Sequence, residues 1–390
     1  MKKNRLVLII SSCMCVVLAG IVMAIAFLHT PYTHKHKLGE AKTYHVHNDG
    51  IYYTRLCQDG CEVAFETKAS LNDVMSTVTA EDKIVLDEDV TLTEEVLIKS
   101  FSGAGDDLQE LELNINFDLN NFTLSTNIDT TQNDSLFMFN ANRGKVVLNV
   151  KNGKIESQDV SYIFRFKNNR ISGENIEVNI DNLECEVTGI QATPLFASEC
   201  MKMKLNANNS KFVSCNSGTY KGDYGVGVFI NSDSEFNFNK CYFEGGDAVY
   251  VKSGIVNLNG CHLVNAGLAS HTSQSVDTFS AVGACLVADN YATKRAISQY
   301  AITIENCSME SRASFKMIYV IESGDKGVQL GVNENSIIDV KSCIFNNNPT
   351  AKTIPQYSLV QYPNGQAPQN NGTDTWSCGV FTDSIATISE

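Results

Sequence analysis

The chain has 390 residues, of which 43% are hydrophobic and 19% are charged. This composition excludes an intrinsically disordered protein, because it supplies enough apolar material for an extended core. The 44 acidic residues outnumber the 30 basic ones and give a net charge of −14, which excludes nucleic acid as a favourable partner because phosphates would be repelled.

The N-terminus combines a basic start, MKKNR, with a charge-free and mostly apolar run from Leu6 to Leu28. A helix of roughly 20 such residues spans a bilayer, and basic residues before it favour retention of that end in the cytoplasm. We therefore predict a signal anchor over residues 1–28. Ala24 and Ala26 also form a small-x-small site, so a signal peptide cleaved after Ala26 is the alternative. Both predictions place the remaining chain outside the cytoplasm, tethered to the cell surface or secreted.

Residues 29–65 contain five of the seven histidines and are interpreted as a polar stalk. His34 and His36, like His45 and His47, form His-x-His pairs that share one face of an extended chain. A zinc-capturing stalk is the alternative, although no cysteine or carboxylate in this segment completes a recognisable ligand set.

A repeated apolar spacing is the strongest signal in the chain. Around one reference position, apolar residues recur five and three residues earlier and two residues later. The eight reference residues are Phe122, Gly153, Leu183, Ser210, Cys241, Cys261, Cys307 and Cys343. The residue before the reference is often Asn, Gly or Lys, and Asn and Gly tolerate the left-handed backbone of a corner. Two short strands meeting at such a corner predict a parallel β-solenoid of about eight or more coils over residues 66–390, spaced by roughly 4.8 Å.

The start of this region predicts a cap on the solenoid. The segment SLNDVMSTVTAEDKIVLDEDVTL carries a short amphipathic helix (Leu71, Val74, Met75, Val78), followed by strands from Ile84 and Val90. A helix over the first coil would protect the open sheet edges from association with other chains.

The run from Ser70 to Ser125, which ends INFDLNNFTLS, resembles the opening of right-handed parallel β-helix proteins of the pectate-lyase-like superfamily. Asn121 stands where that pattern usually has Gly. The resemblance covers residues 70 to about 350 and implies an all-β, single-stranded right-handed β-helix with an N-terminal capping helix. It does not specify an activity, because enzymes and non-enzymatic surface proteins share this fold.

The thirteen cysteines fall into several groups. Four occupy the same inward position of successive coils and are predicted to form a row of free, inert thiols: Cys241, Cys261, Cys307 and Cys343. Cys57 and Cys61 flank a glycine-containing turn in CQDGC and are predicted to form a small disulfide loop, with a zinc site as the weaker alternative.

The stretch GGDAVYVKSG, residues 245–254, raises the question of an active site. It resembles the catalytic turn of polygalacturonases, which implies carboxylates for an inverting attack by water, but Gly246 stands where the first catalytic Asp would be. Asp247 and Asp233 are the remaining carboxylate candidates. A lyase would instead use Lys252 as base beside Ca²⁺, although no calcium-loop spacing is visible. Residues 245–254 also fit an ordinary coil of the solenoid, with Lys252 facing solvent, and we favour that interpretation.

The long intervals between the later repeats suggest a binding face on loops. Tyr291, Lys294, Arg295 and Tyr300 are the candidate contacts for a sugar or protein partner. The sequence therefore predicts a membrane-tethered extracytoplasmic module that binds a polysaccharide or a surface protein without catalysis, with no cofactor and no resident metal. A polysaccharide hydrolase or lyase with its site around Asp247, and a purely structural spacer, are the alternatives.

Overall fold

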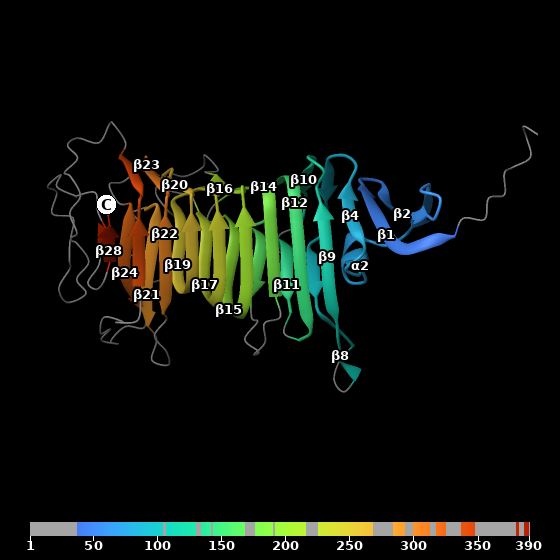
Figure 1. Cartoon of the computed structure of the whole chain (residues 1–390), viewed down its shortest axis with the longest axis horizontal. Coiled ribbons are helices and arrows are strands. Elements are labelled where there is room, and N and C mark those ends of the chain that lie inside the picture. Colours follow the sequence, from blue (N-terminus) through green and yellow to red (C-terminus); the bar gives the residue numbers. More distant parts are fainter. Residues whose placement is uncertain are drawn as a thin grey trace, which may run out of the picture. The chain divides into compact units, whose positions relative to one another are not determined.

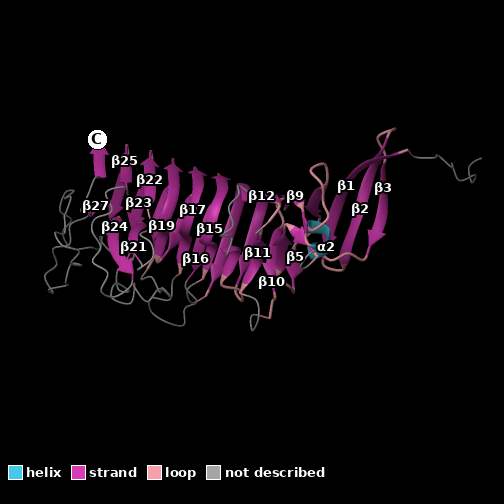
Figure 2. Ribbon diagram, turned by 90° about the horizontal axis from the view of Figure 1, so that it is seen from below, coloured by secondary structure: helices cyan, strands magenta, loops and turns pink. Residues whose placement is uncertain are grey.

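The computed structural model describes residues 37–103, 107–129, 134–141, 143–167, 176–189, 192–215, 225–267, 284–292, 299–312, 317–324, 337–347, 380–381 and 386–389. The predicted anchor, His34 and His36 lie outside these ranges. Within them, no helix is long and apolar enough to cross a bilayer. The chain forms two compact units, Met1–Glu40 with Leu56–Glu62 and Ala41–Arg55 with Val63–Glu390. The fold is all-β with one large, mostly parallel sheet, consistent with the predicted solenoid (Figures 1 and 2).

The elements follow one another as short strands. The first are β1 (Leu38–His47), β2 (Gly50–Cys57), β3 (Glu62–Thr67), α2 (Leu71–Met75), β4 (Lys83–Leu86), β5 (Val90–Leu92), β6 (Val96–Lys99), β7 (Phe101–Ser102) and β8 (Gln109–Glu110). Next come β9 (Glu112–Asp118), β10 (Thr123–Thr126), β11 (Ser135–Asn140), β12 (Lys145–Ser157), β13 (Tyr162–Lys167), β14 (Ile176–Thr188), β15 (Thr193–Asn208), β16 (Lys211–Cys215), β17 (Val226–Asn239) and β18 (Tyr242–Gly245). The last are β19 (Asp247–Asn259), β20 (His262–Asn265), β21 (Leu286–Ala292), β22 (Tyr300–Glu305), β23 (Ser308–Ser311), β24 (Ile318–Gly324), β25 (Ile337–Lys341), β26 (Ile344–Asn347), β27 (Val380–Phe381) and β28 (Ala386–Ser389).

Strands of the coils pair in parallel with their equivalents one coil earlier and one coil later, as β12 does with β9 and β14, whereas β7 and β8 form a separate antiparallel pair. The predicted downstream register is confirmed in every coil, because these residues pair in succession: Leu124, Ile155, Cys185, Phe212, Phe243, Leu263, Met309 and Phe345. The residue before each reference position has a positive φ, as predicted for a corner: Asn121, Asn152, Asn182, Asn209, Lys240, Gly260, Asn306 and Ser342.

The first corner differs from the prediction. Phe117 lies opposite Val150, and not opposite Leu148 as the repeat spacing implied. The reason is a longer turn, in which Asn120 and Asn121 both adopt the left-handed conformation, with φ of 52° and 68°. The upstream strand of this coil is thereby displaced by two residues, which preserves the inward and outward alternation of side chains.

The predicted amphipathic helix is present as α2, although it ends at Met75, before Val78. Ser70 is its N-cap and forms a capping box with Asp73, while Leu71, Val74 and Met75 are buried. Hydrogen bonds from the Ser70 backbone and side chain lower the pKa of Asp73. Residues predicted as a stalk also join the sheet, because Thr43–Val46 of β1 pair in parallel with Lys83–Leu86 of β4.

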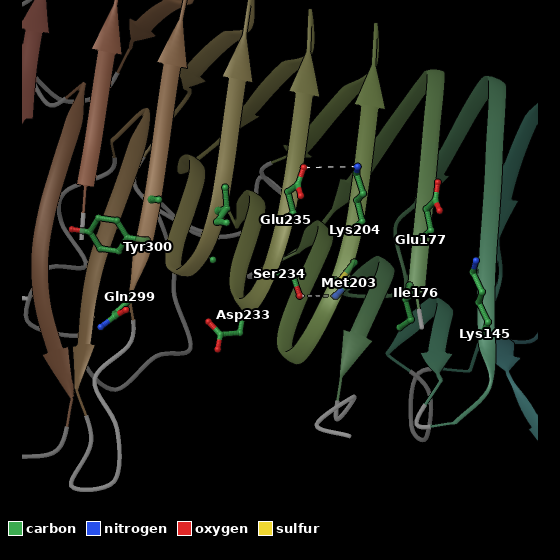
Figure 3. A pocket seen from close by; sticks show the side chains of 13 residues that line it. Lys145, Ile176, Glu177, Met203, Lys204, Asp233, Ser234, Glu235, Gln299 and Tyr300 are labelled. Carbon is green, nitrogen blue, oxygen red and sulfur yellow. Dashed lines mark hydrogen bonds and ion pairs between the residues drawn. The ribbon is translucent and has the colours of Figure 1, made fainter. Parts of the chain in front are cut away.

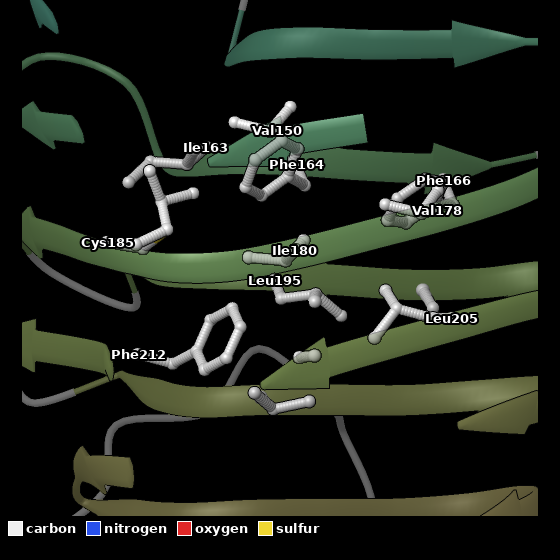
Figure 4. Packing of buried hydrophobic residues seen from close by; sticks show 14 of the residues in the cluster. Val150, Ile163, Phe164, Phe166, Val178, Ile180, Cys185, Leu195, Leu205 and Phe212 are labelled. Atoms are coloured by element: carbon white, nitrogen blue, oxygen red, sulfur yellow. The ribbon is translucent and has the colours of Figure 1, made fainter. Parts of the chain in front are cut away.

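The interior of the coils is apolar and continuous. Inward residues of adjacent strands pack together in Figure 4, among them Val178, Ile180, Leu205 and Phe212. The ring of Phe212 stacks on that of Phe243 with centroids 5.6 Å apart. Such burial is the main stabilising contribution to a fold whose coils contact only their neighbours.

The cysteines of the predicted row are free thiols in the structure. Each donates to a backbone carbonyl oxygen of the preceding coil, at 3.4–3.6 Å. A hydrogen bond with the neighbouring thiol, together with burial, raises the pKa of both Cys261 and Cys307 to about 12. The first unit contains the Cys57–Cys61 disulfide, with Cα atoms 5.3 Å apart.

A polar cluster follows β10. Ser157 donates to Asp159 Oδ1 at 2.7 Å, and the amide of Val160 donates to the same oxygen at 3.0 Å. Partial burial alone would raise the pKa of Asp159, but hydrogen bonds from Thr126, Ser157 and the Ile128 amide hold it below the ordinary value. The carboxylate is therefore a stabilising acceptor in the folded chain.

Candidate functional site

An open groove of about 680 Å³ crosses the outward side of β12, β14, β15, β17, β19 and β22 (Figure 3). It exists because outward positions of consecutive coils align in rows. Glu177, Lys204, Glu235 and Ile255 are successive members of one row, each paired with the next across the sheet. Figure 3 shows Lys145, Glu177, Lys204 and Glu235, which project from β12, β14, β15 and β17.

The groove alternates in charge along this row. Lys204 Nζ lies 4.0 Å from Glu235 Oε1, and both side chains remain about half exposed. Asp233 is exposed at the same rim. The next row member, Ile255, is 51% exposed, an unusual position for a large aliphatic side chain in this protein. The surface therefore offers hydrogen-bond donors, acceptors and one apolar contact.

A row of amides runs beside the charged row on the same outward face. Its members are Asn116, Asn149, Asn179, Asn206, Asn237 and Asn257. From Asn149 onward, each Nδ2 donates to the Oδ1 of the preceding member at 2.8–3.1 Å. The second Nδ2 hydrogen of Asn237 is directed to Glu235 Oε1, at 2.8 Å. These bonds fix the amides and hold Glu235 in place above the sheet.

The wall of the groove at β19 depends on a glycine. Gly254 has φ of +107°, and a Cβ there would lie 2.4 Å from the carbonyl oxygen of Ser232. Ser232 in turn donates to Ser234 at 2.7 Å, and Ser234 accepts from the Met203 amide at 2.9 Å. The corner of the groove is therefore packed backbone against backbone, which permits no larger residue.

The structure places the predicted site residues in different locations. Asp233 and Tyr300 both line the groove, where Tyr300 is almost fully buried. Tyr291 lies in β21, and Lys294 and Arg295 lie outside the described ranges. The sequence reasoning missed Lys145, Glu177, Lys204 and Glu235. Glu177, Lys204 and Glu235 occupy one outward position of the same repeat, so the repeat could have identified them as one row.

Asp247 is buried and accepts a hydrogen bond from the Ala284 amide at 2.8 Å. The prediction that Lys252 faces solvent is wrong, because its side chain is 6% exposed. Its Nζ lies 3.6 Å from Asp289 Oδ2, and the Tyr250 hydroxyl donates to the same oxygen at 2.7 Å. Burial lowers the pKa of Lys252 and raises that of Tyr250 well above its ordinary value.

The second His-x-His pair contacts a carboxylate that comes later in the chain. The rings of His45 and His47 both stack on Tyr52. Asp87 Oδ2 lies 2.9 Å from His45 Nδ1 and 3.4 Å from His47 Nε2. Over the part of the chain that the structure describes, however, no group of three or more His, Cys, Asp or Glu residues is arranged to hold a metal ion.

Comparisons with known proteins add little to this geometry. No family model matches the sequence, and no curated protein matches it. Among solved structures, ORF18 of Geobacillus virus E2 is similar with a TM-score of 0.36 and 12% identity, covering 70% of this chain. The match spans about half of that protein, 54% of its length, and at this level of similarity it carries no argument about function.

Proposed function

We propose that the protein is a membrane-tethered, extracytoplasmic β-helix of the right-handed, pectate-lyase-like type that binds an extended glycan in its groove without cleaving it. The observation that carries this proposal is the groove of about 680 Å³ across six strands, lined by aligned polar side chains. A chain-like ligand lying across the strands would meet an equivalent position at every coil, with steps of roughly 4.8 Å.

The lining favours a neutral glycan over a polyuronate or a protein helix. Sugar hydroxyls both donate and accept hydrogen bonds, so they match a surface with Lys145 and Lys204 beside Glu177 and Glu235. With Asp233 the groove carries three acidic and two basic side chains, a balance that repels a polyanion. The apolar face of a sugar ring would cover the exposed Ile255.

The buried state of Asp247 supports binding without catalysis. A catalytic carboxylate must reach the substrate, whereas Asp247 is 1% exposed and accepts a backbone hydrogen bond from Ala284. The alternative, a polysaccharide-degrading enzyme, rests on a different observation, which is that Asp233 and Glu235 both line the groove. Paired carboxylates of this kind serve as acid and base in glycosidases.

The test uses the purified full chain against neutral and acidic linear polysaccharides, with retardation in glycan-containing native gels as the readout. Lys204→Gln removes a charged donor inside the groove. Lys211→Gln is its matched control, because Lys211 is equally exposed and pairs with Glu184 at 3.0 Å outside the groove. A lost hydrogen bond to a charged group costs about 1.5–3 kcal/mol, or roughly tenfold or more in affinity.

The expected result is retardation by a neutral glycan that Lys204→Gln weakens and Lys211→Gln leaves unchanged. Equal effects of the two variants, or no retardation by any glycan, would contradict binding in the groove. New reducing ends or unsaturated products that disappear in Asp233→Asn or Glu235→Gln would establish the enzymatic alternative. Products that are lost only in Asp247→Asn would instead place the active site within residues 245–254.

A further inference from the structure

One lysine and one aspartate meet in a dry part of the structure, on neighbouring strands β19 and β21. Lys252 and Asp289 have side-chain exposures of 6% and 0%, and Nζ lies 3.6 Å from Oδ2. The strand register brings them together. Val251 of β19 pairs with Ala288 of β21, so the residues that come next, Lys252 and Asp289, lie beside each other on adjacent strands. The rings of Phe229 and Tyr250 lie 5.9 Å and 5.7 Å from Nζ.

This environment differs from that of the other lysine–carboxylate pairs in the described residues. In those pairs both side chains are at least 29% exposed, so water solvates both charges. Removing two ions from water is costly, and their attraction repays the cost only partly. Transfer of one proton from Lys252 Nζ to the Asp289 carboxylate removes both charges and leaves an amine beside a carboxylic acid.

We infer that Lys252 and Asp289 react with each other to form an intramolecular amide bond that links two adjacent coils. The uncharged Nζ attacks Cγ of the protonated Asp289, and a carbon–nitrogen bond forms. The carbon–oxygen bond of the former hydroxyl then breaks, and this oxygen leaves as water with one proton from nitrogen. Atoms and charge balance, and no oxidant, cofactor or second substrate is needed.

The neighbours of the pair support this reaction. The Tyr250 hydroxyl donates to Asp289 Oδ2 at 2.7 Å, so it polarises the carboxyl group toward attack. Burial keeps the amine in its nucleophilic, uncharged form more readily than at an exposed site, because desolvation lowers the pKa of Lys252. The strands hold the two groups together, which replaces a bimolecular encounter by a fixed geometry.

The decisive experiment is peptide mapping of the full chain after denaturation and reduction. Residues 253–293 contain no Lys or Arg, so the amide predicts that trypsin does not cleave after Lys252 and that residues 241–252 and 253–294 stay joined as one peptide. This joined peptide is lighter than the linear peptide 241–294 by one water molecule, and lighter than the two separate peptides by two. A joined peptide with the full linear mass would contradict the amide. Separate peptides of full mass, with cleavage after Lys252, would overturn the inference, and this readout on the natural chain requires no variant to fold.

Two variants locate the bond. Lys252→Arg keeps the positive charge but is expected to abolish the joined peptides and restore the lost water. Lys151→Arg is the control, because Lys151 lies 3.2 Å from Asp118 in a closer but exposed pair, and it should leave the joined peptide unchanged. Joined peptides that persist in Lys252→Arg would show that another residue carries the link and would refute the assignment.

Discussion

Two phenylalanines test whether the inward and outward positions of the coils are assigned correctly. Phe212 is fully buried, and its ring stacks on Phe243 at 5.6 Å and meets Phe238 edge-on at 6.0 Å. Phe196 also has two ring neighbours, Tyr162 at 4.6 Å and Phe229 at 4.9 Å, but it is half-buried on the outward side. The same substitution therefore removes two ring contacts at both sites and differs in burial.

Replacing Phe212 by alanine should lower the free energy of unfolding by about 3–5 kcal/mol, because it leaves a cavity in the packed interior. Replacing Phe196 should lower it by about 1–3 kcal/mol, from two ring pairs at about 0.5–1.5 kcal/mol each, since water fills the vacated space. Urea unfolding followed by circular dichroism measures the total effect. Because coils of a solenoid can unfold separately, amide hydrogen exchange in β14, β16 and β18 should report where the loss occurs.

The outcome that refutes the assignment is specific. If Phe196→Ala destabilises the protein as much as Phe212→Ala, the outward row is more buried than the structure describes. If Phe212→Ala costs less than about 1 kcal/mol, the interior is not packed around that ring.

Three further predictions concern local features. Ser70→Ala should destabilise the cap by about 0.5–2 kcal/mol and increase hydrogen exchange in α2 selectively; unchanged exchange there would contradict the capping box. Asp159 has a lowered folded pKa, so its stabilising contribution is complete above about pH 4 and is lost as pH falls through that folded pKa, which makes Asp159→Asn less sensitive to acid than the wild type in thermal unfolding. Cys261 and Cys307 should resist iodoacetamide at about pH 8 in the native protein and react after unfolding, because their pKa values are raised to about 12; rapid native alkylation would contradict their burial.

The repeat in the sequence predicted the register because inward packing and left-handed corners both restrict residue type. The repeat did not predict the register at the first corner, where both Asn120 and Asn121 adopt the left-handed conformation. Asparagine also occurs in other turn conformations, so the residue type alone did not show that Asn120 would lengthen this turn. Lys252 was misplaced because its burial depends on Asp289, a partner from the next coil that spacing within one coil does not reveal.

The groove illustrates the same limit. Glu177, Lys204 and Glu235 are ordinary charged residues in the sequence, and they become a row only when the coils are stacked in register. Outward positions tolerate almost any polar residue, so their alternation of charge carries little statistical weight. Asp233 is a candidate from the polygalacturonase resemblance and Tyr300 from the long intervals between repeats, and both line the groove.

The corners have a consequence for how the chain can change in length. One coil takes 20 residues, from Cys241 to Cys261, and the next takes 46, from Cys261 to Cys307. The strands on either side of these corners nevertheless pair in the same register. Insertions are therefore absorbed between the strands, and whole coils can be gained or lost without altering their neighbours. Duplication or removal of one coil would lengthen or shorten the outward rows by a single step, so the size of ligand that the surface accommodates can evolve in discrete increments.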